Sequence, residues 1–528
     1  MVAQSRSFPA KALKPHIMFQ RLTTLASIEA ARRQIAGLFQ QHAEWFCTAG
    51  RGETYALRRE EMDISVAHER LVLSCWTEQG SRSWRILGWQ WNGQMLLLQA
   101  SRRMGAELPL IELIPRASEA AVAATIRTAR EFRCHRLAQL ACAWQPETRI
   151  ERCTLSPGTR PGQPGRYARI ILHRKQTRIA VCGPVASSHP ASVDAFLSAT
   201  LLWFIRTADR IKPPYIQQLW LVVSDELLKP LLYRVALLSE GLRNTIQVFT
   251  VDDDLINFCA AQTFERPELW KKKLKQFPRV PAATQTAQTS TIIASAPEAI
   301  DVVHARHGET LRYFGLPFAR VRSLLGTERV WFGLDGTRRR LLDESTRREW
   351  ETLLHDLREH RSAFAVDRHH AFYRSAAEAW LESLLRRDIT KLDPGLIIAP
   401  LHAQFRTARG GKLGIRPIDL LALRQDGRLV VIELKVYEDR EHVLQGADYW
   451  RRVEAHRRRG HIAKARLFGD LKIKDEPPLV YLVAPTLRVH PSFATLARCI
   501  DGDIEIYRFD INEDWRSGVR VMRRMRVN

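Results

Sequence analysis

The pattern of apolar and polar residues predicts two stretches with the same order of helices and strands. Amphipathic segments indicate helices, and short runs rich in Val, Ile and Leu indicate strands. In each stretch the order is helix, three strands, helix, strand, helix, strand. The first stretch is predicted to contain helices at 119–144, 193–211 and 227–238, with strands at 149–155, 167–172, 178–182, 219–223 and 245–251. The second is predicted to contain helices at 376–386, 441–458 and 493–499, with strands at 396–405, 418–423, 429–436, 479–485 and 503–509.

The two stretches also resemble each other residue by residue towards their ends. IKPPYIQQLWLVVSDELLKPLL, which starts at Ile211, is similar to IKDEPPLVYLVAPTLRVHPSFA, which starts at Ile473, and TIQVFTVDDD is similar to DIEIYRFDIN. We therefore expect residues 119–255 and 374–513 to be two copies of one fold. The alternative is two α/β domains that share common building blocks.

The rest of the chain is expected to divide around these copies. Residues 1–118 are predicted to hold a helix at 26–47 and then strands, whose tryptophans either pack in a core or stack on bases. Residues 256–300 are predicted to be a linker, because 278–296 is rich in Thr, Ala and Gln without periodicity and follows a basic run at 271–275. Residues 301–373 are predicted to form a small α+β segment before a C-terminal domain at 374–528. The tryptophans in question are Trp84, Trp89 and Trp91.

The charge balance indicates a polyanionic partner. The chain has 81 Lys and Arg against 57 Asp and Glu, a formal net charge of +24. Nucleic acid is the commonest partner of such an excess, and a generally basic surface is the alternative. The 8 cysteines form no CxxC pair, and the N-terminal stretch lacks the apolar core of a signal peptide. We therefore expect a reduced, cytoplasmic protein, and the lack of a GxxxxGK[ST] motif predicts no motor of its own.

Two apolar runs in the C-terminal part, 418–423 and 429–436, carry charges where buried strands normally have none. Asp419 lies in the first run, and Glu433 and Lys435 lie in the second. Burying an ionised side chain is costly unless the charge is paired or binds a metal. These three residues therefore need a structural or chemical reason.

The turn between the two runs decides whether the charges meet. A two-residue turn would place Asp419 opposite Leu434, whereas a three-residue turn ending at Gly427 would place it opposite Glu433. The second turn is favoured because glycine readily adopts the left-handed conformation of the accompanying bulge. Glu433 and Lys435 share one face of their strand. Two carboxylates and an ammonium group are then predicted to converge.

An Asp followed by Glu-x-Lys on the next strand resembles the PD-(D/E)xK nuclease superfamily. The following predicted helix contains Gln445-Gly446-Ala447-Asp448-Tyr449, which is similar to the QxxxY motif of RecB-like members, and the whole resembles NucS-type endonuclease domains. The resemblance covers about 374–513. It implies an α/β fold with a restriction-endonuclease-like αβββαβ core and a Mg²⁺- or Mn²⁺-dependent nuclease that hydrolyses phosphodiester bonds of DNA, with RNA as a further possible substrate.

The resemblance also implies roles for individual residues. Asp419, Glu433 and the backbone carbonyl of Leu434 would bind the metal, and Lys435 would orient or deprotonate the attacking water or neutralise developing charge. An acid from the first helix would assist, with Glu378 preferred and Glu382 in reserve. Gln445 and Tyr449 would hold Lys435 or a phosphate, although a core role for Tyr449 is an equal alternative. The predicted nucleic-acid contacts are Arg451, Arg452, Arg457, Arg458 and Arg459.

The first copy is expected to have lost this chemistry. Aligning Arg178 with Arg428 places Gly183 at the position of Glu433 and Val185 at the position of Lys435. Alternatives to an autonomous nuclease are a non-catalytic nucleic-acid-binding or assembly protein, in which the three charges form a structural salt bridge, and a nuclease subunit active only with a helicase partner. A homodimer is also compatible with the sequence.

Overall fold

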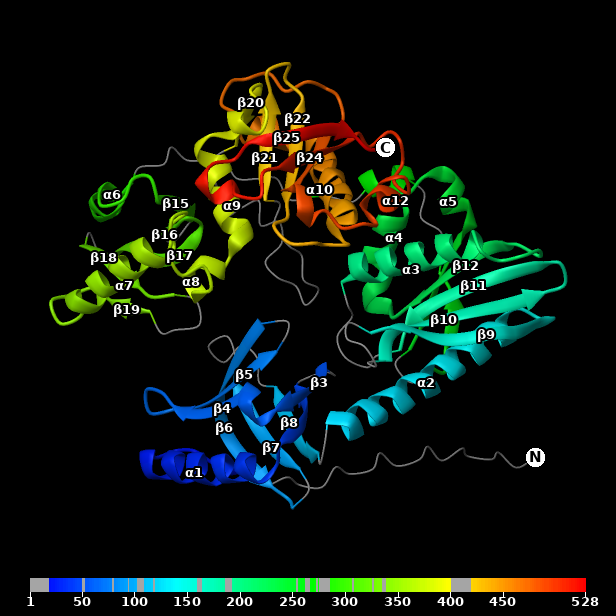
Figure 1. Ribbon diagram of the computed structural model, residues 1–528, viewed down its shortest axis with the longest axis horizontal. Helices are drawn as coiled ribbons and strands as arrows, with labels where there is room; N and C mark the ends of the chain where they lie inside the picture. Colours follow the sequence, from blue (N-terminus) through cyan, green and yellow to red (C-terminus); the bar gives the residue numbers. More distant parts are fainter. Residues whose placement is uncertain are drawn as a thin grey trace, which may run out of the picture. The chain divides into compact units, whose positions relative to one another are not determined.

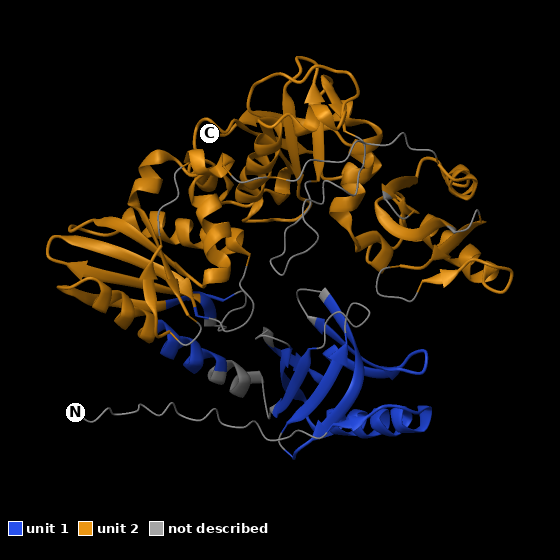
Figure 2. Cartoon of the chain, turned by 180° about the vertical axis from the view of Figure 1, so that it is seen from behind, with its two compact units in different colours: residues 1–134, 155–166, 185–189 blue, residues 135–154, 167–184, 190–528 orange. Residues whose placement is uncertain are grey.

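The chain folds into mixed α and β structure in which the contacts define two compact units. The computed structural model describes residues 19–49, 53–77, 80–93, 95–101, 109–116, 119–158, 164–185, 192–252, 255–261, 266–271, 274, 285–305, 308–324, 327–334, 339–399 and 419–528. Unit 1 comprises residues 1–134, 155–166 and 185–189, and unit 2 comprises 135–154, 167–184 and 190–528 (Figure 2). The described helices include none that is both long and apolar enough to cross a membrane.

The N-terminal part of unit 1 is an antiparallel sheet packed against one helix. The helix is α1 (Leu25–Gln41), and the sheet has the order β3-β2-β8-β7-β6-β5-β4, with β1 (Gln20–Arg21) paired to β6. The strands are β2 (Glu44–Ala49), β3 (Glu53–Arg58), β4 (Met62–Val66), β5 (Leu71–Thr77), β6 (Gly80–Trp91), β7 (Leu96–Ser101) and β8 (Leu110–Arg116). The predicted helix at 26–47 ends too late, because residues 44–49 alternate between half-buried and buried positions and form a strand.

The tryptophans of this sheet belong to its core. Trp84 and Trp89 are 3% and 6% exposed, and Trp91 packs against the same apolar cluster. Side chains this deeply buried have no face on which a base can stack. The base-stacking alternative is therefore wrong for Trp84 and Trp89.

A first α/β region follows in the chain (Figure 1). Its helices are α2 (Glu119–Trp144), α3 (Val193–Ala208), α4 (Asp225–Val235) and α5 (Glu240–Thr245). Its strands are β9 (Thr148–Pro157), β10 (Pro164–Arg174), β11 (Thr177–Pro184), β12 (Ile216–Val223), β13 (Ile246–Val251) and β14 (Phe258–Ala260), which pair in sequence order. Helix α3 begins where the side chain of Ser192 caps it by accepting the N–H of Ala195 at 3.0 Å.

Part of the segment predicted as a linker forms a helix. Residues 287–294 form helix α6 (Ala287–Ala294), which is capped by Thr286 and buries Thr289 and Ile292. Residues 275–284 and most of the basic run lie outside the described residues. The helix forms because Thr286 and Thr289 both donate hydrogen bonds to the buried carboxylate of Glu309, at 2.7 and 2.5 Å.

Helix α6 belongs to a small β region that contains the predicted α+β segment. Its five-stranded sheet runs β15 (Ile300–Ala305), β16 (Gly308–Tyr313), β17 (Leu316–Leu324), β18 (Thr327–Phe332) and β19 (Arg340–Leu341), with neighbours antiparallel. Helix α7 (Arg347–His360) packs against it through Leu357, Trp350 and Leu353. The short helix α8 (Ala371–Arg374) leads on to the C-terminal part.

The second α/β region completes the chain. Its helices are α9 (Ala377–Arg387), α10 (His442–Arg457), α11 (His461–Lys464) and α12 (Phe493–Ala497). Its strands are β20 (Leu396–Ile398), β21 (Leu420–Arg424), β22 (Leu429–Leu434), β23 (Leu479–Pro485), β24 (Ile506–Ile511) and β25 (Val521–Arg526), again paired in sequence order. All residues of β22 and β23 are buried, as expected for parallel strands covered on both faces.

The two α/β regions have the same sheet order and the same strand directions. In the first, β10–β11 is antiparallel, β11–β12 and β12–β13 are parallel, and β13–β14 is antiparallel. In the second, β21–β22, β22–β23, β23–β24 and β24–β25 repeat those directions in the same sequence. Each region has a helix before its first strand, and helices also lie between its third and fourth strands and between its fourth and fifth: α3 and then α4 with α5 in the first region, and α10 with α11 and then α12 in the second. The prediction of a common strand order is confirmed.

Candidate active site

The hairpin of β21 and β22 brings Asp419 and Glu433 together. Its pairs run from Leu423–Leu429 to Leu420–Ile432, so the next position outward sets Asp419 opposite Glu433. The turn closes with the N–H of Gly427 on the carbonyl of Arg424 at 2.8 Å, and Gly427 has a φ of 85°. The predicted three-residue turn, and the register that follows from it, are confirmed.

Lys435 is surrounded by carboxylates. Its Nζ lies 2.8 Å from Oε1 of Glu433, 3.6 Å from Asp439 and 3.8 Å from Glu378. Asp419 completes the group, because its Oδ2 accepts the backbone N–H of Leu434 at 2.9 Å. The four acids and one lysine come from α9, from the end of β22 and from the loops beside the strands.

Burial makes the site electrostatically unbalanced. Glu433 is 1% exposed, and burial followed by the charge of Asp419 raises its pKa well above the ordinary value. Burial also raises the pKa of Asp419 to about 6, although Lys435 opposes the shift. Burial lowers the pKa of Lys435, but the neighbouring carboxylates outweigh burial and raise it. One ammonium group therefore faces more negative charge than it neutralises.

These features fit a divalent cation. Oε2 of Glu433 is buried and has no hydrogen-bond partner among the described residues. The charge of Asp419 raises the pKa of Glu433, and both carboxyl groups would ionise readily once a cation lay between them. Carboxylate oxygens are the ligands that Mg²⁺ prefers. Within the described part of the chain, no three His, Cys, Asp or Glu side chains form a ready-made metal cluster. A cation here would therefore depend on Asp419, Glu433 and ligands other than a third preformed side chain.

The first helix of the region supplies one of the two predicted acids. Glu378 approaches Lys435, whereas Glu382 is bound by Arg386 at 2.7 Å and by Arg312 at 3.4 Å. Arg386 also donates to the backbone carbonyl of Asp419 at 3.0 Å. Helix α9 thus fixes the backbone of Asp419 through Arg386 and points Glu378 towards the lysine.

Gln445 and Tyr449 are buried on α10. Gln445 donates through Nε2 to Glu441 at 3.3 Å, and its Oε1 is buried without a partner among the described residues. Tyr449 is 3% exposed and belongs to an apolar cluster with Leu421 and Val431. The charges of Glu433 and Asp419 add to burial in raising the pKa of Tyr449. The described contacts of Lys435 are to carboxylates and not to Gln445 or Tyr449.

Sequence reasoning missed two neighbours of the site. Asp439 follows Lys435 by four residues, and its Oδ1 accepts the N–H of Glu441 ahead of α10 at 2.7 Å. His442, the first residue of α10, is buried with Nε2 3.2 Å from the carbonyl oxygen of Glu433. Burial and the charge of Lys435 lower the pKa of His442 to about 3, so the ring is neutral and donates to that carbonyl. The carboxyl of Asp439, four positions beyond the lysine, was the available signal.

The five arginines predicted to contact nucleic acid have internal partners. Arg451 and Arg452 each lie 2.6 Å from the buried carboxylate of Asp448. The other contacts are Arg457 and Arg458 with Glu454 at 2.6 Å, and Arg459 with the carbonyl oxygens of Ala455 and Trp270. Because α10 is buried on almost every side, basic residues three and four positions after an acid pair with it. The contact of these arginines with nucleic acid stays a prediction.

A different set of basic residues lies around Arg169 and His490. Arg206 in the last turn of α3 and Arg440 just before α10 are exposed, and neither has a carboxylate partner among the described residues. Burial lowers the pKa of Arg169 on β10, and the charges of Arg440 and Arg206 lower it further. The same two arginines lower the pKa of His490 after burial. Charges that repel one another in this way suit a phosphate group.

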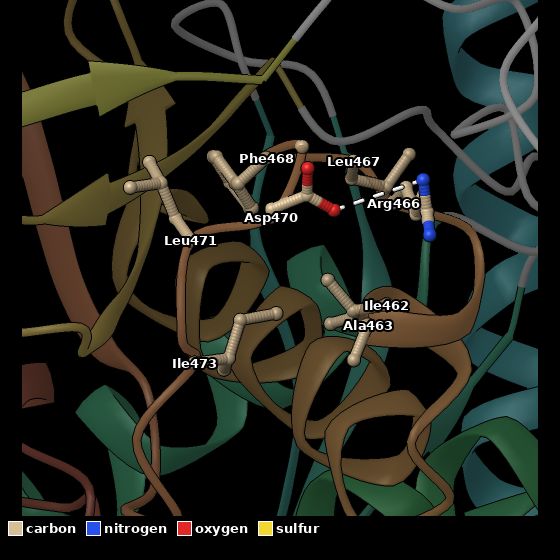
Figure 3. A pocket seen from close by; sticks show the side chains of 9 residues that line it. Ile462, Ala463, Arg466, Leu467, Phe468, Asp470, Leu471 and Ile473 are labelled. Carbon is tan, nitrogen blue, oxygen red and sulfur yellow. Dashed lines mark ion pairs between the residues drawn. The ribbon is translucent and has the colours of Figure 1, made fainter.

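A cavity of about 230 Å³ lies elsewhere in the second region (Figure 3). None of the predicted site residues lines it. Arg466 and Asp470 approach each other at its rim, 3.7 Å apart, and the remaining wall is largely apolar. Its lining residues are Ile462, Ala463, Arg466, Leu467, Phe468, Gly469, Asp470, Leu471 and Ile473.

Comparisons with known proteins identified no relative of this chain. Searches against protein-family models, curated proteins and solved structures each found no match.

Proposed function

We propose that this protein is a Mg²⁺- or Mn²⁺-dependent nuclease that hydrolyses phosphodiester bonds of DNA at the Asp419–Glu433–Lys435 site. The observation that carries the proposal is the convergence of two mutually repelling carboxylates and a lysine at a buried strand end, with Oε2 of Glu433 lacking a partner among the described residues. A structural salt bridge would pair its charges fully, whereas this arrangement retains an excess of negative charge.

The arrangement of elements supports the same proposal. The second α/β region begins with a helix and three strands, followed by helical structure and a further strand, which is compatible with the αβββαβ core that the resemblance to PD-(D/E)xK nucleases implies. In such a core Asp419 and Glu433 would supply the acids at adjacent strand ends, and Gln445 and Tyr449 would lie on the next helix.

The residues divide the chemistry between them. Asp419 and Glu433 would hold the metal, and the Leu434 carbonyl is the proposed third ligand. The cation, when bound, would neutralise phosphate charge and lower the pKa of a coordinated water. Lys435 stays protonated at neutral pH because its pKa is raised, so we assign it to orienting the water and neutralising charge on the phosphate rather than to removing a proton. Glu378 and Asp439 keep Lys435 beside the scissile group.

The first α/β region is proposed to be a degenerate copy of the second. The pair Ala168–Gly183 occupies the place of Asp419 opposite Glu433, so neither position carries an acid. A Cβ at Gly183 would lie 2.8 Å from the side chain of Leu137, which leaves no room for a glutamate. The copy therefore serves scaffolding or nucleic-acid binding.

The test is cleavage of supercoiled plasmid and labelled DNA with Mg²⁺ or Mn²⁺, stopped by chelator. We expect Asp419→Ala, Glu433→Ala and Lys435→Ala each to abolish cleavage while the circular dichroism spectrum is unchanged. Glu438→Ala, an exposed acid close in sequence, is the matched control and should retain activity. Wild-type turnover in any of the three variants would refute the site, and binding without cleavage would favour a non-catalytic nucleic-acid-binding protein.

A further inference from the structure

Helices of the first α/β region pack directly on the helices of the second. A single apolar cluster contains Leu197 and Leu201 of α3 together with Leu444 and Ala447 of α10 and Leu496 of α12. Helix α10 also packs closely against its own sheet. A Cβ added at Gly446 would lie only 2.5 Å from the side chain of Leu482. Helix α10, which carries Gln445 and Tyr449, is therefore held between its own sheet and the first region.

A buried charge network crosses this interface at the centre of α10. Asp448, between Gln445 and Tyr449 in sequence, has a side chain that is 0% exposed. Arg234 of α4 reaches it through Nη1 at 2.8 Å and binds Asp194 of α3 through Nε at 2.9 Å and Nη2 at 3.2 Å. One arginine of the first region thus joins two carboxylates, one from each region.

A second contact crosses the interface at the start of α10. The hydroxyl of Ser192, at the N-cap of α3, donates to Oε2 of Glu441 at 2.5 Å. The same oxygen accepts from Nε2 of Gln445 at 3.3 Å. Both ends of the Gln445–Tyr449 segment are therefore tied to residues of the first region.

We infer that Arg234 and Ser192 are positioning residues for Gln445 and Tyr449, so that the degenerate region acts as a built-in partner of the catalytic one. A buried ion pair contributes little net stability but favours one arrangement of the helices, because any shift leaves a charge unpaired. When Arg234 binds Asp448, helix α10 is restricted to one rotation about its axis and one distance from its sheet. Gln445 and Tyr449, on the same helix, are then restricted as well. Reactions that need aligned groups are sensitive to displacements of this kind.

The inference rests on the proposed function, and its test separates the two. Hydrogen exchange of the peptide amides of 441–450 reports on α10 whether or not the protein cleaves DNA. Arg234→Met should speed this exchange at least about tenfold, Ser192→Ala should do so at residues 441–445, and Arg234→Lys should restore much of the protection. The matched control is Arg243→Met, which removes a different arginine of the first region, one that also reaches the second region but pairs there with Asp501, outside α10, at 3.8 Å.

Kinetics provide the second readout. In a wild type that cleaves, Arg234→Met should lower kcat at least about tenfold with little change in KM, and its effect should not add to that of Gln445→Ala. Arg243→Met should leave both constants unchanged. Unchanged exchange in α10, or an Arg234 effect that adds fully to that of Gln445→Ala, would overturn the inference. A wild type that does not cleave would refute the proposed function, and exchange would then decide the inference alone.

Discussion

Replacing Asp419 by asparagine should stabilise the metal-free protein and remove its response to Mg²⁺. The substitution keeps the shape of the side chain and an oxygen that accepts the N–H of Leu434, but it removes one of two carboxylates that repel each other. Most substitutions at a buried hydrogen-bonded site destabilise a protein, so the expected sign is unusual. It follows because burial disfavours the charged form of Asp419, and Lys435 offsets this cost only in part.

The magnitude follows from the pKa of Asp419. A pKa raised from 3.8 to about 6 corresponds to about 3 kcal/mol lost on ionisation, at about 1.4 kcal/mol for each tenfold change in proton affinity. The folded protein holds this proton up to about pH 6, whereas the unfolded chain loses it near 3.8. Stability of the wild type therefore falls as pH rises from about 4 to about 6 and stays low above that. The advantage of Asp419→Asn should be about 1–3 kcal/mol at pH 7.5 and should vanish near pH 4.

Native-state hydrogen exchange of the peptides covering β21 and β22 gives the free energy of opening for this hairpin alone, which suits a chain with several domains. Adding Mg²⁺ at about 100 times its dissociation constant should stabilise the wild type by about 2.7 kcal/mol and leave the variant unchanged. The control is Asp393→Asn, which should destabilise the protein. The carboxylate of Asp393 accepts hydrogen bonds from the hydroxyl of Tyr481 at 2.9 Å and from Arg524 at 3.2 Å. Equal opening energies for wild type and Asp419→Asn at pH 7.5 would refute the reasoning.

Three further predictions concern charges outside the Asp419–Glu433–Lys435 group. Arg206→Ala and Arg440→Ala should each reduce the slope of log affinity for DNA against log salt concentration by about 1, measured by fluorescence anisotropy, and an unchanged slope would show that neither contacts phosphate. Arg361 is 0% exposed and donates hydrogen bonds to the carbonyl oxygens of Tyr313, Phe314, Phe372, Ser375 and Ala376. Arg361→Met should therefore lower the local free energy of opening, measured by hydrogen exchange, by about 3 kcal/mol or more. An unchanged free energy would contradict the role of Arg361 in connecting the small β region to the segment before α9. Burial would raise the pKa of Asp448, but the charges of Arg234, Arg451 and Arg452 outweigh burial and hold that pKa well below 3.8. The stability that ionised Asp448 contributes is therefore present above about pH 4 and is lost as the pH falls further. Thermal unfolding between pH 7 and 3 should therefore show a larger loss for the wild type than for Asp448→Asn, and parallel profiles would exclude this contribution.

The sequence by itself determined the strands, the turn and the register of the β21–β22 hairpin. These features depend on local rules, since side chains alternate along a strand and the length of a turn fixes which residues face each other. Asp426-Gly427 followed by Glu433 was therefore enough to place Asp419 opposite Glu433. The shared order of elements in the two α/β regions was predictable for the same reason, because each element carries its own periodicity.

Only the tertiary structure decided which charged side chains are exposed and which are paired inside the protein. Arg451 and Arg452 look like a solvated basic face in the sequence, yet Asp448 and the covering helices of the first region bury them. Ser192 and Glu441 are 249 residues apart, and no local pattern predicts that the hydroxyl of Ser192 donates to the carboxylate of Glu441. The pKa of Asp419, and the lack of a partner for Oε2 of Glu433 among the described residues, likewise depend on how much water and how many charges surround these groups. Burial and long-range pairing are set by the packing of whole helices and sheets, and a sequence specifies that packing only through all of its residues together.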